Sequence, residues 1–174
     1  GDGKAIGDAV GHDRHGGPSA PAAPDLHPEF KRQLGAVLDG YLEIQAALAN
    51  DDTRAAKAAA DQTRTALAGV DMALVQGDEH TDWMKHAGLL ERLLQALAAA
   101  DGVEPVRVQF ALLFGQVLAV LGRFGSLGKT LYKASCPMAF DNRGASWVQA
   151  GEEVSNPYFG HVMLRCGDLE EVFK

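Results

Sequence analysis

Two short clusters near the C-terminus contain the residues best suited to chemistry. The first is Cys136-Pro137-Met138, and the second contains Met163 and Cys166, three positions apart. Together they hold both cysteines and two of the four methionines of this 174-residue chain. Thiolate and thioether sulfurs are soft ligands that select soft ions such as Cu(I) over ions that prefer oxygen. The clusters therefore indicate either a soft-metal site or, if the two thiols join, a crosslink.

The spacing in each cluster suits a different local geometry. In an extended segment residues i and i+2 face the same side, and Pro137 favours an extended conformation for Cys136. Cys136 and Met138 could then project toward one ion. Met163 and Cys166 are neighbours in a helical turn, where residues i and i+3 lie together. Two such arms would give a four-sulfur site suited to Cu(I) or Ag(I), whereas Zn(II) more readily uses cysteine and histidine.

A third arm is a candidate in the helical region. His80 and Met84 are four positions apart, beside Trp83, and so share one face of a helix. His80 is our candidate fifth ligand, although a histidine closing the end of a helical bundle is an equal alternative. Met84 is better interpreted as a residue that fills irregular gaps in packing. His161, close to Met163, is not expected to bind the metal.

A disulfide is the competing explanation for the two cysteines. Joining Cys136 to Cys166 would stabilise the fold by about 3 to 4 kcal/mol in the chain-entropy model. Spacing alone does not separate the two explanations. Methionines at both clusters favour the metal, because a structural crosslink has no need of thioethers.

Other chemistries have no support in the sequence. It contains no Cys-x-x-Cys pair, no haem attachment motif, no glycine-rich phosphate loop and no convincing nucleophile with a base. The adjacent pairs Glu152-Glu153 and Glu170-Glu171 are typical of a solvated surface. We therefore predict that the protein is not an enzyme.

Charge and hydropathy exclude further classes. Sixteen Lys and Arg against 23 Asp and Glu give a net charge of −7 without a basic stripe, which argues against nucleic acid as a partner. The most apolar stretch, residues 106–121, contains Arg107, Gln109 and Gln116. A membrane-spanning helix of about twenty apolar residues rarely tolerates these. We expect no membrane span.

The chain divides into a tail and one domain. Residues 1–28 are rich in glycine and proline and almost lack large apolar side chains, which predicts a disordered tail or linker. It contains His12, His15 and His27. A metal-scavenging tract is one interpretation of these histidines, but a solvated linker is favoured. Residues 29–174 would form the metal-binding domain.

Four amphipathic stretches dominate this domain. The first runs from Pro28 to about Asn50, and the second starts at Asp51 or Asp52 and continues to a break at Gly77-Asp78. The third ends at Asp101-Gly102, and the fourth ends near Phe124. Apolar residues recur in each at three- and four-residue steps. Four such helices joined by short turns predict a mainly α protein with an antiparallel four-helix bundle.

After Gly125 the helical periodicity disappears. Residues 131–134 and 145–149 suit short extended pieces, and the turn-rich segment 141–144 between them predicts a small hairpin. The rest is expected to be an ordered loop, with helix resuming no earlier than about Val162. The predicted fold is thus a bundle with a C-terminal irregular or short β layer that carries the sulfur motifs.

Longer runs around these motifs carry a family resemblance. The runs are residues 136–147 and 156–167, together with Asp71-Met72 and residues 80–84. They resemble a family of uncharacterised bacterial periplasmic domains, found alone or appended to the adaptor (membrane fusion) subunits of CusB-type copper and silver efflux pumps. The resemblance covers roughly residues 30–170. Phe114-Gly115 departs from it, where a serine is expected.

The resemblance implies a periplasmic location and a role in heavy-metal handling. Its motif positions fall on Cys136, Met138, Met163, Cys166 and His80. We therefore expect a Cu(I) binding and delivery module, with Ag(I) as the alternative ion, that works with a periplasmic adaptor or pump component. The other hypothesis is a domain stapled by a Cys136–Cys166 disulfide, which docks on an efflux adaptor without binding metal. A metal sensor is a third hypothesis that the sequence does not separate from delivery.

Overall fold

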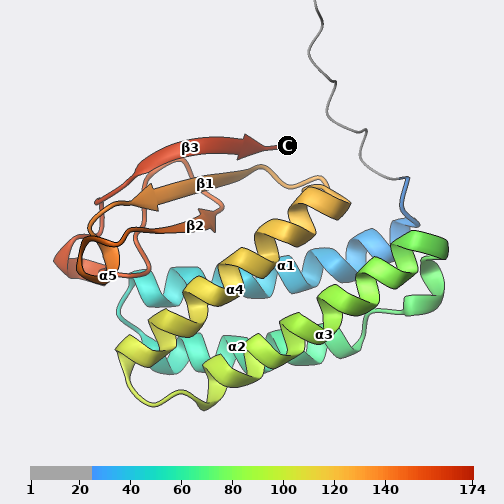
Figure 1. The fold of residues 1–174 in the computed structure, drawn as a ribbon, viewed down its shortest axis with the longest axis horizontal. Coiled ribbons are helices and arrows are strands. Elements are labelled where there is room, and N and C mark those ends of the chain that lie inside the picture. Colours follow the sequence, from blue (N-terminus) through green and yellow to red (C-terminus); the bar gives the residue numbers. More distant parts are fainter. Residues whose placement is uncertain (1–24) are drawn as a thin grey trace, which may run out of the picture.

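The computed structural model describes residues 25–174 and is mainly helical (Figure 1). Four long helices come first: α1 (Pro28–Ala49), α2 (Thr53–Ala68), α3 (Gly77–Ala99) and α4 (Val103–Phe124). A small sheet follows, made of β1 (Leu131–Cys136), β2 (Ala145–Gln149) and β3 (Asp168–Phe173). Short helical turns complete the order: η1 (Met72–Leu74), α5 (Ala139–Asn142) and η2 (Gly160–Val162). The prediction of a mainly α protein is confirmed.

The four helices bury the apolar stripes that the sequence predicts. On α4 the buried residues recur at three- and four-residue steps from Val106 to Phe124, and α1 shows the same pattern from Phe30 to Leu48. Consecutive helices pack against each other: α1 against α2, α2 against α3, and α3 against α4. Aromatic rings also join α1 to α4 across the core, where Tyr41 stacks on Phe110 with ring centroids 5.3 Å apart.

Helix α2 is shorter than predicted. It ends at Ala68, where Gly69 caps it, although the apolar stripe continues to Leu74. The side chains of Val70 and Val75 are still buried, but they reach the core from the connection that contains η1. Apolar spacing does not separate a helix from a connection that returns its side chains to the same core. Gly77, with φ of +62°, then begins α3 rather than only breaking the previous helix.

The C-terminal layer is a three-stranded antiparallel sheet in the order β2-β1-β3. The predicted hairpin is confirmed as β1 and β2, with Cys136 opposite Ala145. The third strand was not predicted, and the segment that contains it was expected to be a loop with a late helix. β3 has the sequence DLEEVF, in which apolar and polar residues do not alternate, and all its residues but Phe173 are exposed. Strand prediction depends on that alternation.

The sheet covers α1 and α4 (Figure 1), and β2 makes its contacts with these helices. Trp147 and Val148 of β2 are fully buried. The amide of Gln45, on α1, donates a hydrogen bond of 2.7 Å to the carbonyl oxygen of Ser155, in the segment after β2. β3 lies at the outer edge of the sheet, with Glu170 and Glu171 on it.

The boundary predicted between tail and domain, after residue 28, lies close to residue 25, where the described residues begin. Leu26 is buried in the core, and the side chain of His27 caps α1 by accepting a hydrogen bond from the backbone N–H of Glu29. The described residues thus include the last four of the segment predicted as a tail, 25–28. His12 and His15 lie outside the described residues.

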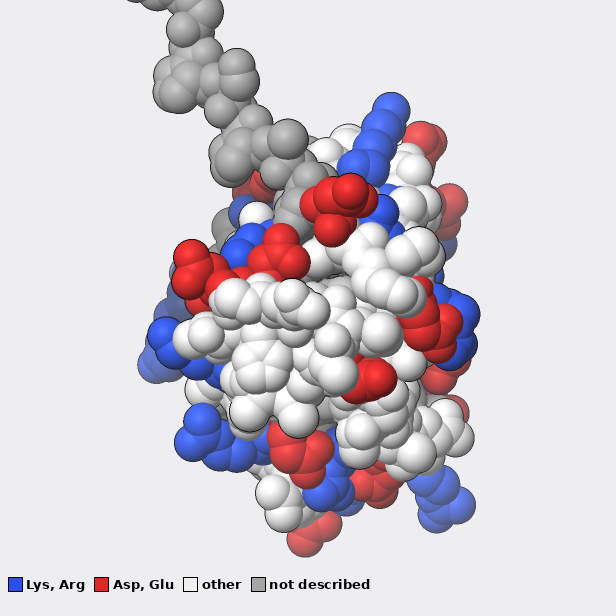
Figure 2. Space-filling model, turned by 90° about the vertical axis from the view of Figure 1, so that its right-hand side faces the viewer, with Lys and Arg blue, Asp and Glu red and all other residues white. Residues whose placement is uncertain are grey.

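The visible surface carries charges of both signs, as the sequence contains. Figure 2 shows the end of the molecule at which α3 begins, where Lys and Arg are interspersed with Asp and Glu around an uncharged centre. Within residues 25–174, α4 alone is long and apolar enough to cross a membrane by length and composition. Its inward stripe is buried in the core described above.

Candidate functional site

The two cysteines meet at one end of the sheet. Cys136 ends β1, and Cys166 lies two residues before β3, whose first residue, Asp168, pairs with Ser135. Antiparallel pairing therefore brings the two cysteines together, and their Sγ atoms are 2.7 Å apart. Both are free thiols. Cys136 is fully buried, whereas Cys166 is partly exposed.

Close packing places Cys166 against the sheet. Its neighbour Gly167 has φ of +137°, and a Cβ at that position would lie 2.7 Å from the carbonyl oxygen of Ser135 and 2.9 Å from the ring of Trp147. Only glycine allows this approach and this backbone conformation. The fully buried Asn156 donates a 2.8 Å hydrogen bond from its side-chain amide to the carbonyl oxygen of Cys166.

The Cys166 thiol keeps its proton at neutral pH. The hydrogen bond with Cys136 and, secondarily, burial raise the pKa of Cys166 to about 11. A thiolate is the form that binds metal or attacks a disulfide. Ionisation of Cys166 therefore requires a partner, such as a soft cation, that replaces the proton.

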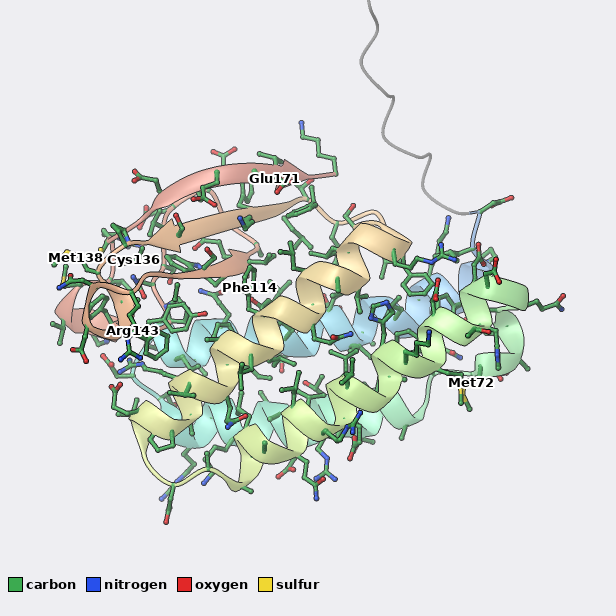
Figure 3. All side chains as sticks on the ribbon, viewed as in Figure 1. Met72, Phe114, Cys136, Met138, Arg143 and Glu171 are labelled. Atoms are coloured by element: carbon green, nitrogen blue, oxygen red, sulfur yellow. The ribbon has the colours of Figure 1, made fainter. Side chains whose placement is uncertain are left out.

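The two methionines line one hollow beside the thiols, which we call the first hollow. It has a volume of about 520 Å³, and Met138 and Met163 line it together with Phe140, Tyr158, Phe159 and Arg107. The structure thus brings one methionine from each sequence cluster to the same place. Met138 is 46% exposed. In Figure 3, Cys136 and Met138 lie close together at the end of the sheet where α5 is placed.

In the first cluster, the prediction that Cys136 and Met138 lie on one side of an extended segment is only half right. Cys136 is extended as expected, but Met138 has helical backbone angles (φ −87°, ψ −12°). The chain turns after Pro137, so the buried thiol and the exposed thioether are not on one face. In the second cluster, the backbone N–H of Cys166 donates a 3.0 Å hydrogen bond to the carbonyl oxygen of Met163, which closes a single turn.

The structure does not bring His80 to the sulfurs. His80 belongs to the first turn of α3, which begins beside η1, at the opposite end of the helices from Cys136 (Figures 1 and 3). Its neighbour Trp83 is buried against Phe30, with ring centroids 5.6 Å apart, and Met84 is exposed. The alternative interpretation of His80, as a residue at the end of the helices, agrees with this position.

His161 contacts a carboxylate rather than a sulfur. Its backbone N–H donates a 2.8 Å hydrogen bond to Asp51, and its ring is largely exposed. No group of three or more His, Cys, Asp or Glu side chains is placed to hold a metal ion within residues 25–174. Soft-metal binding here would depend on the two thiols and the methionines.

A buried arginine next to this site was missed in the sequence. Arg107 donates to the carbonyl oxygen of Pro157 at 2.9 Å, to that of Leu48 at 3.3 Å and to the carboxylate of Asp51 at 3.0 Å. It joins α4 to the turn after α1 and to the loop that leads to Cys166. The sequence signal, a charge within the most apolar helix, was used only to exclude a membrane span.

Asp51 completes this connection. The backbone N–H of His161 and, next, the Arg107 guanidinium hold the pKa of the Asp51 carboxyl below its usual range. Gly160, with φ of +59°, lies so close to this carboxylate that a Cβ would overlap it. The charged network therefore fixes the loop on which Met163 and Cys166 lie.

Comparison with known protein families supplies one match. A family described as a protein of unknown function (DUF3347) matches residues 37–129, a little over half of the chain. The chain belongs to the DUF3347 family. The DUF3347 span runs from within α1 to the segment after α4, so both cysteines lie beyond it. No curated protein and no solved structure matches the chain.

Proposed function

We propose that this DUF3347 protein is a periplasmic module that binds Cu(I) or Ag(I) and delivers the ion to an adaptor or pump component, without catalytic turnover. One observation supports the proposal above the others. Thiols from two separate sequence clusters meet with their Sγ atoms 2.7 Å apart, and one methionine from each cluster lines the adjoining hollow. Softness of all four sulfurs favours monovalent copper or silver.

Binding would exchange protons for the ion. The Cys136 and Cys166 thiols lose their protons to become ligands, so the affinity for metal rises with pH. Two sulfurs about 2.3 Å from a metal at a tetrahedral angle lie about 3.8 Å apart. The pair therefore has to open by about 1 Å. Cys136 is buried in β1, whereas Cys166 is partly exposed and lies outside the strands, so the side chain of Cys166 is the one expected to turn away from its partner.

The methionines give the ion a route in and out. Met138 is about half exposed and lines the first hollow, whereas Cys136, two residues before it in the chain, is buried. A soft ion would meet the thioethers first and the thiols second, and would leave in the reverse order by ligand exchange. We interpret the four long helices as an antiparallel four-helix bundle that supports this layer. The family resemblance around the sulfur motifs favours a place beside an efflux adaptor.

The alternative is a disulfide-stapled interaction domain, and the same distance supports it. Two thiols 2.7 Å apart need little movement to join in an oxidising compartment. Mass spectrometry of untreated protein distinguishes the two states. A two-dalton deficit in the whole population, with no copper uptake after reduction, would favour the staple.

The deciding experiment is an anaerobic titration of the reduced protein with Cu(I) in the presence of a chromophoric Cu(I) chelator. We expect the wild type to take a single Cu(I) ion from the chelator and the Cys136→Ser, Cys166→Ser double variant to take none. Met138→Leu with Met163→Leu should weaken retention. Met72→Leu with Met84→Leu is the matched control, because both residues are exposed on or beside the far end of α3. Equal retention by the wild type and the double serine variant would disprove the proposal.

A further inference from the structure

A second hollow adjoins the first and shares two residues with it. The second hollow, of about 270 Å³, is lined by Val108, Ala111 and Leu112 of α4 together with Phe140, Arg143 and Gly144. Phe140 and Arg143 also line the first hollow. The two hollows therefore form one continuous surface with Phe140 and Arg143 between them, which we call the twin-hollow surface.

Large apolar side chains are exposed along the twin-hollow surface. Val108 and Leu112 are 45% and 55% exposed beside the second hollow, and Met138 and Val162 are 46% and 82% exposed beside the first. Singly exposed apolar residues are ordinary, but a contiguous group indicates a place where another molecule binds.

The wall between the hollows is held in a strained conformation. Phe140, Asp141 and Asn142 have φ values of +52°, +54° and +66°, so three consecutive residues other than glycine are left-handed. This conformation costs about 1 to 2 kcal/mol at Phe140, whereas Asp and Asn adopt it more readily. Hydrogen bonds close the turn, among them that from the N–H of Gly144 to the carbonyl oxygen of Ala139, at 2.9 Å. Such strain is found where a surface has to keep a particular shape for function.

Phe140 is fixed in place by this turn. Its ring packs against that of Tyr158 with centroids 5.2 Å apart, and the Tyr158 hydroxyl donates a 2.6 Å hydrogen bond to the carbonyl oxygen of Ser146. The aromatic wall is thus anchored to β2. A rigid apolar wall between two hollows suits a partner with two apolar side chains, one for each hollow.

Of the described residues, Arg143 is the one charged residue that lines both hollows; Glu104, Arg107 and Asp141 line the first hollow alone, where Glu104 lies 3.6 Å from Arg107. Arg143 is exposed, and no carboxylate within residues 25–174 lies within 4 Å of its guanidinium. Arg107, in contrast, is occupied by Asp51 and by backbone carbonyls. An exposed arginine between two apolar hollows suits a carboxylate, which it can bind through two parallel hydrogen bonds.

We propose that the twin-hollow surface docks a segment of a partner protein in which one Asp or Glu lies between two large apolar side chains. The apolar side chains enter the two hollows, and the carboxylate pairs with Arg143. The docked partner would lie beside Met138, where the proposed function has a metal ion leave the site. The proposal extends that function, but the surface contains neither thiol and is tested without metal.

The test uses the reduced, metal-free full chain as the target for a phage library of random twelve-residue peptides. We expect enrichment of peptides with an acidic residue flanked by Leu, Ile, Phe, Trp or Met. A synthetic peptide from this set should bind Arg143→Gln and Leu112→Gln about tenfold more weakly than the wild type, as substitutions at the centre of an interface do. Replacing its acidic residue by Asn or Gln should cause a similar loss.

Matched controls come from α3. Leu89 and Arg92 are exposed and line neither hollow, so Leu89→Gln and Arg92→Gln should leave peptide affinity unchanged. The Cys136→Ser, Cys166→Ser variant should also bind the peptide, which separates this proposal from metal binding. A library that yields no binder, or peptides that bind Arg143→Gln and Leu112→Gln as tightly as the wild type, would overturn the proposal. Circular dichroism and urea unfolding show whether each variant is folded.

Discussion

The Tyr41 hydroxyl accepts a 3.0 Å hydrogen bond from the backbone N–H of Val148. It connects the centre of α1 to β2, and both residues are buried. The ring of Tyr41 also stacks on Phe110 of α4, with centroids 5.3 Å apart. Burial raises the pKa of Tyr41 well above its usual value, so the hydroxyl stays neutral. One side chain therefore joins two helices and the sheet.

Tyr41→Phe should lower the free energy of unfolding by about 1 to 3 kcal/mol, because the N–H of Val148 is left buried without an acceptor. Urea unfolding followed by circular dichroism measures the change. Tyr132→Phe is the control, since Tyr132 contacts Glu152 at an exposed position. Equal losses in the two variants would show that the hydrogen bond to Val148 does not matter.

Two glycines within helices should respond in opposite ways to alanine. At Gly40, on α1, a Cβ would overlap the side chain of Thr63 on α2, so Gly40→Ala should destabilise the protein by about 1 to 3 kcal/mol. At Gly88, on α3, a Cβ meets nothing within 4 Å, so Gly88→Ala should stabilise it by about 0.5 to 1 kcal/mol. Thermal unfolding of both variants gives the comparison. Adding Thr63→Ala to Gly40→Ala should recover part of the loss.

Asp51 should make the free energy of unfolding depend on pH in the acidic range. Its carboxyl pKa is lower in the folded protein than in the unfolded chain, because the His161 N–H and Arg107 stabilise the charged form. The contribution is therefore complete above the unfolded pKa, near 4, and is lost as pH falls through the lower folded value. Unfolding free energies from pH 7 to pH 2.5 should fall less steeply in Asp51→Asn. Asp78→Asn, at the exposed start of α3, should follow the wild type.

The reactivity of Cys166 should depend on Cys136. With a pKa of about 11, raised mainly by Cys136, the Cys166 thiol is protonated at pH 8 and should react slowly with iodoacetamide. Cys136→Ala should lower this pKa and speed alkylation at pH 8 several-fold, as measured by mass spectrometry under reducing conditions. An unchanged rate would contradict the assignment. The raised pKa of Cys166 also links stability to pH. Between pH 9 and 11 the folded protein keeps the proton that the unfolded chain loses, so the free energy of unfolding should fall as pH rises through that interval.

The helices could be predicted because their apolar residues follow one period and their ends carry capping residues. The stripes from Phe30 to Leu48 and from Val106 to Phe124 are buried as expected. Asp52 accepts a hydrogen bond from the N–H of Ala55 and caps α2, one of the two positions predicted for its start. The end of α2 and the whole of β3 depend on tertiary contacts, which local spacing does not contain.

The sequence singled out the two cysteines that meet, but it grouped them with His80, which lies at the other end of the helices (Figure 1). Chain spacing pointed to Cys136 and Cys166, and antiparallel pairing of β1 with β3 explains why they meet.

The early start of the turn after Pro137 could not be foreseen, because Phe140, just before the predicted turn 141–144, is left-handed against its intrinsic preference. The role of Arg107 could not be predicted either, because it depends on contacts between distant parts of the chain. Its partners lie 50 to 59 positions away in the chain.

The outer strand of the sheet also bears on how the protein behaves at high concentration. Within the described residues β3 pairs with β1 alone, which leaves one row of its backbone N–H and C=O groups free to pair with a strand of another molecule. Asp168, Glu170 and Glu171 place three acidic side chains on this strand, of which Glu170 pairs with Lys133 of β1 at 3.0 Å. Two copies that approach edge to edge near neutral pH would bring like charges together. The carboxylates of β3 thus act as a barrier to self-association, and acidification would remove that barrier.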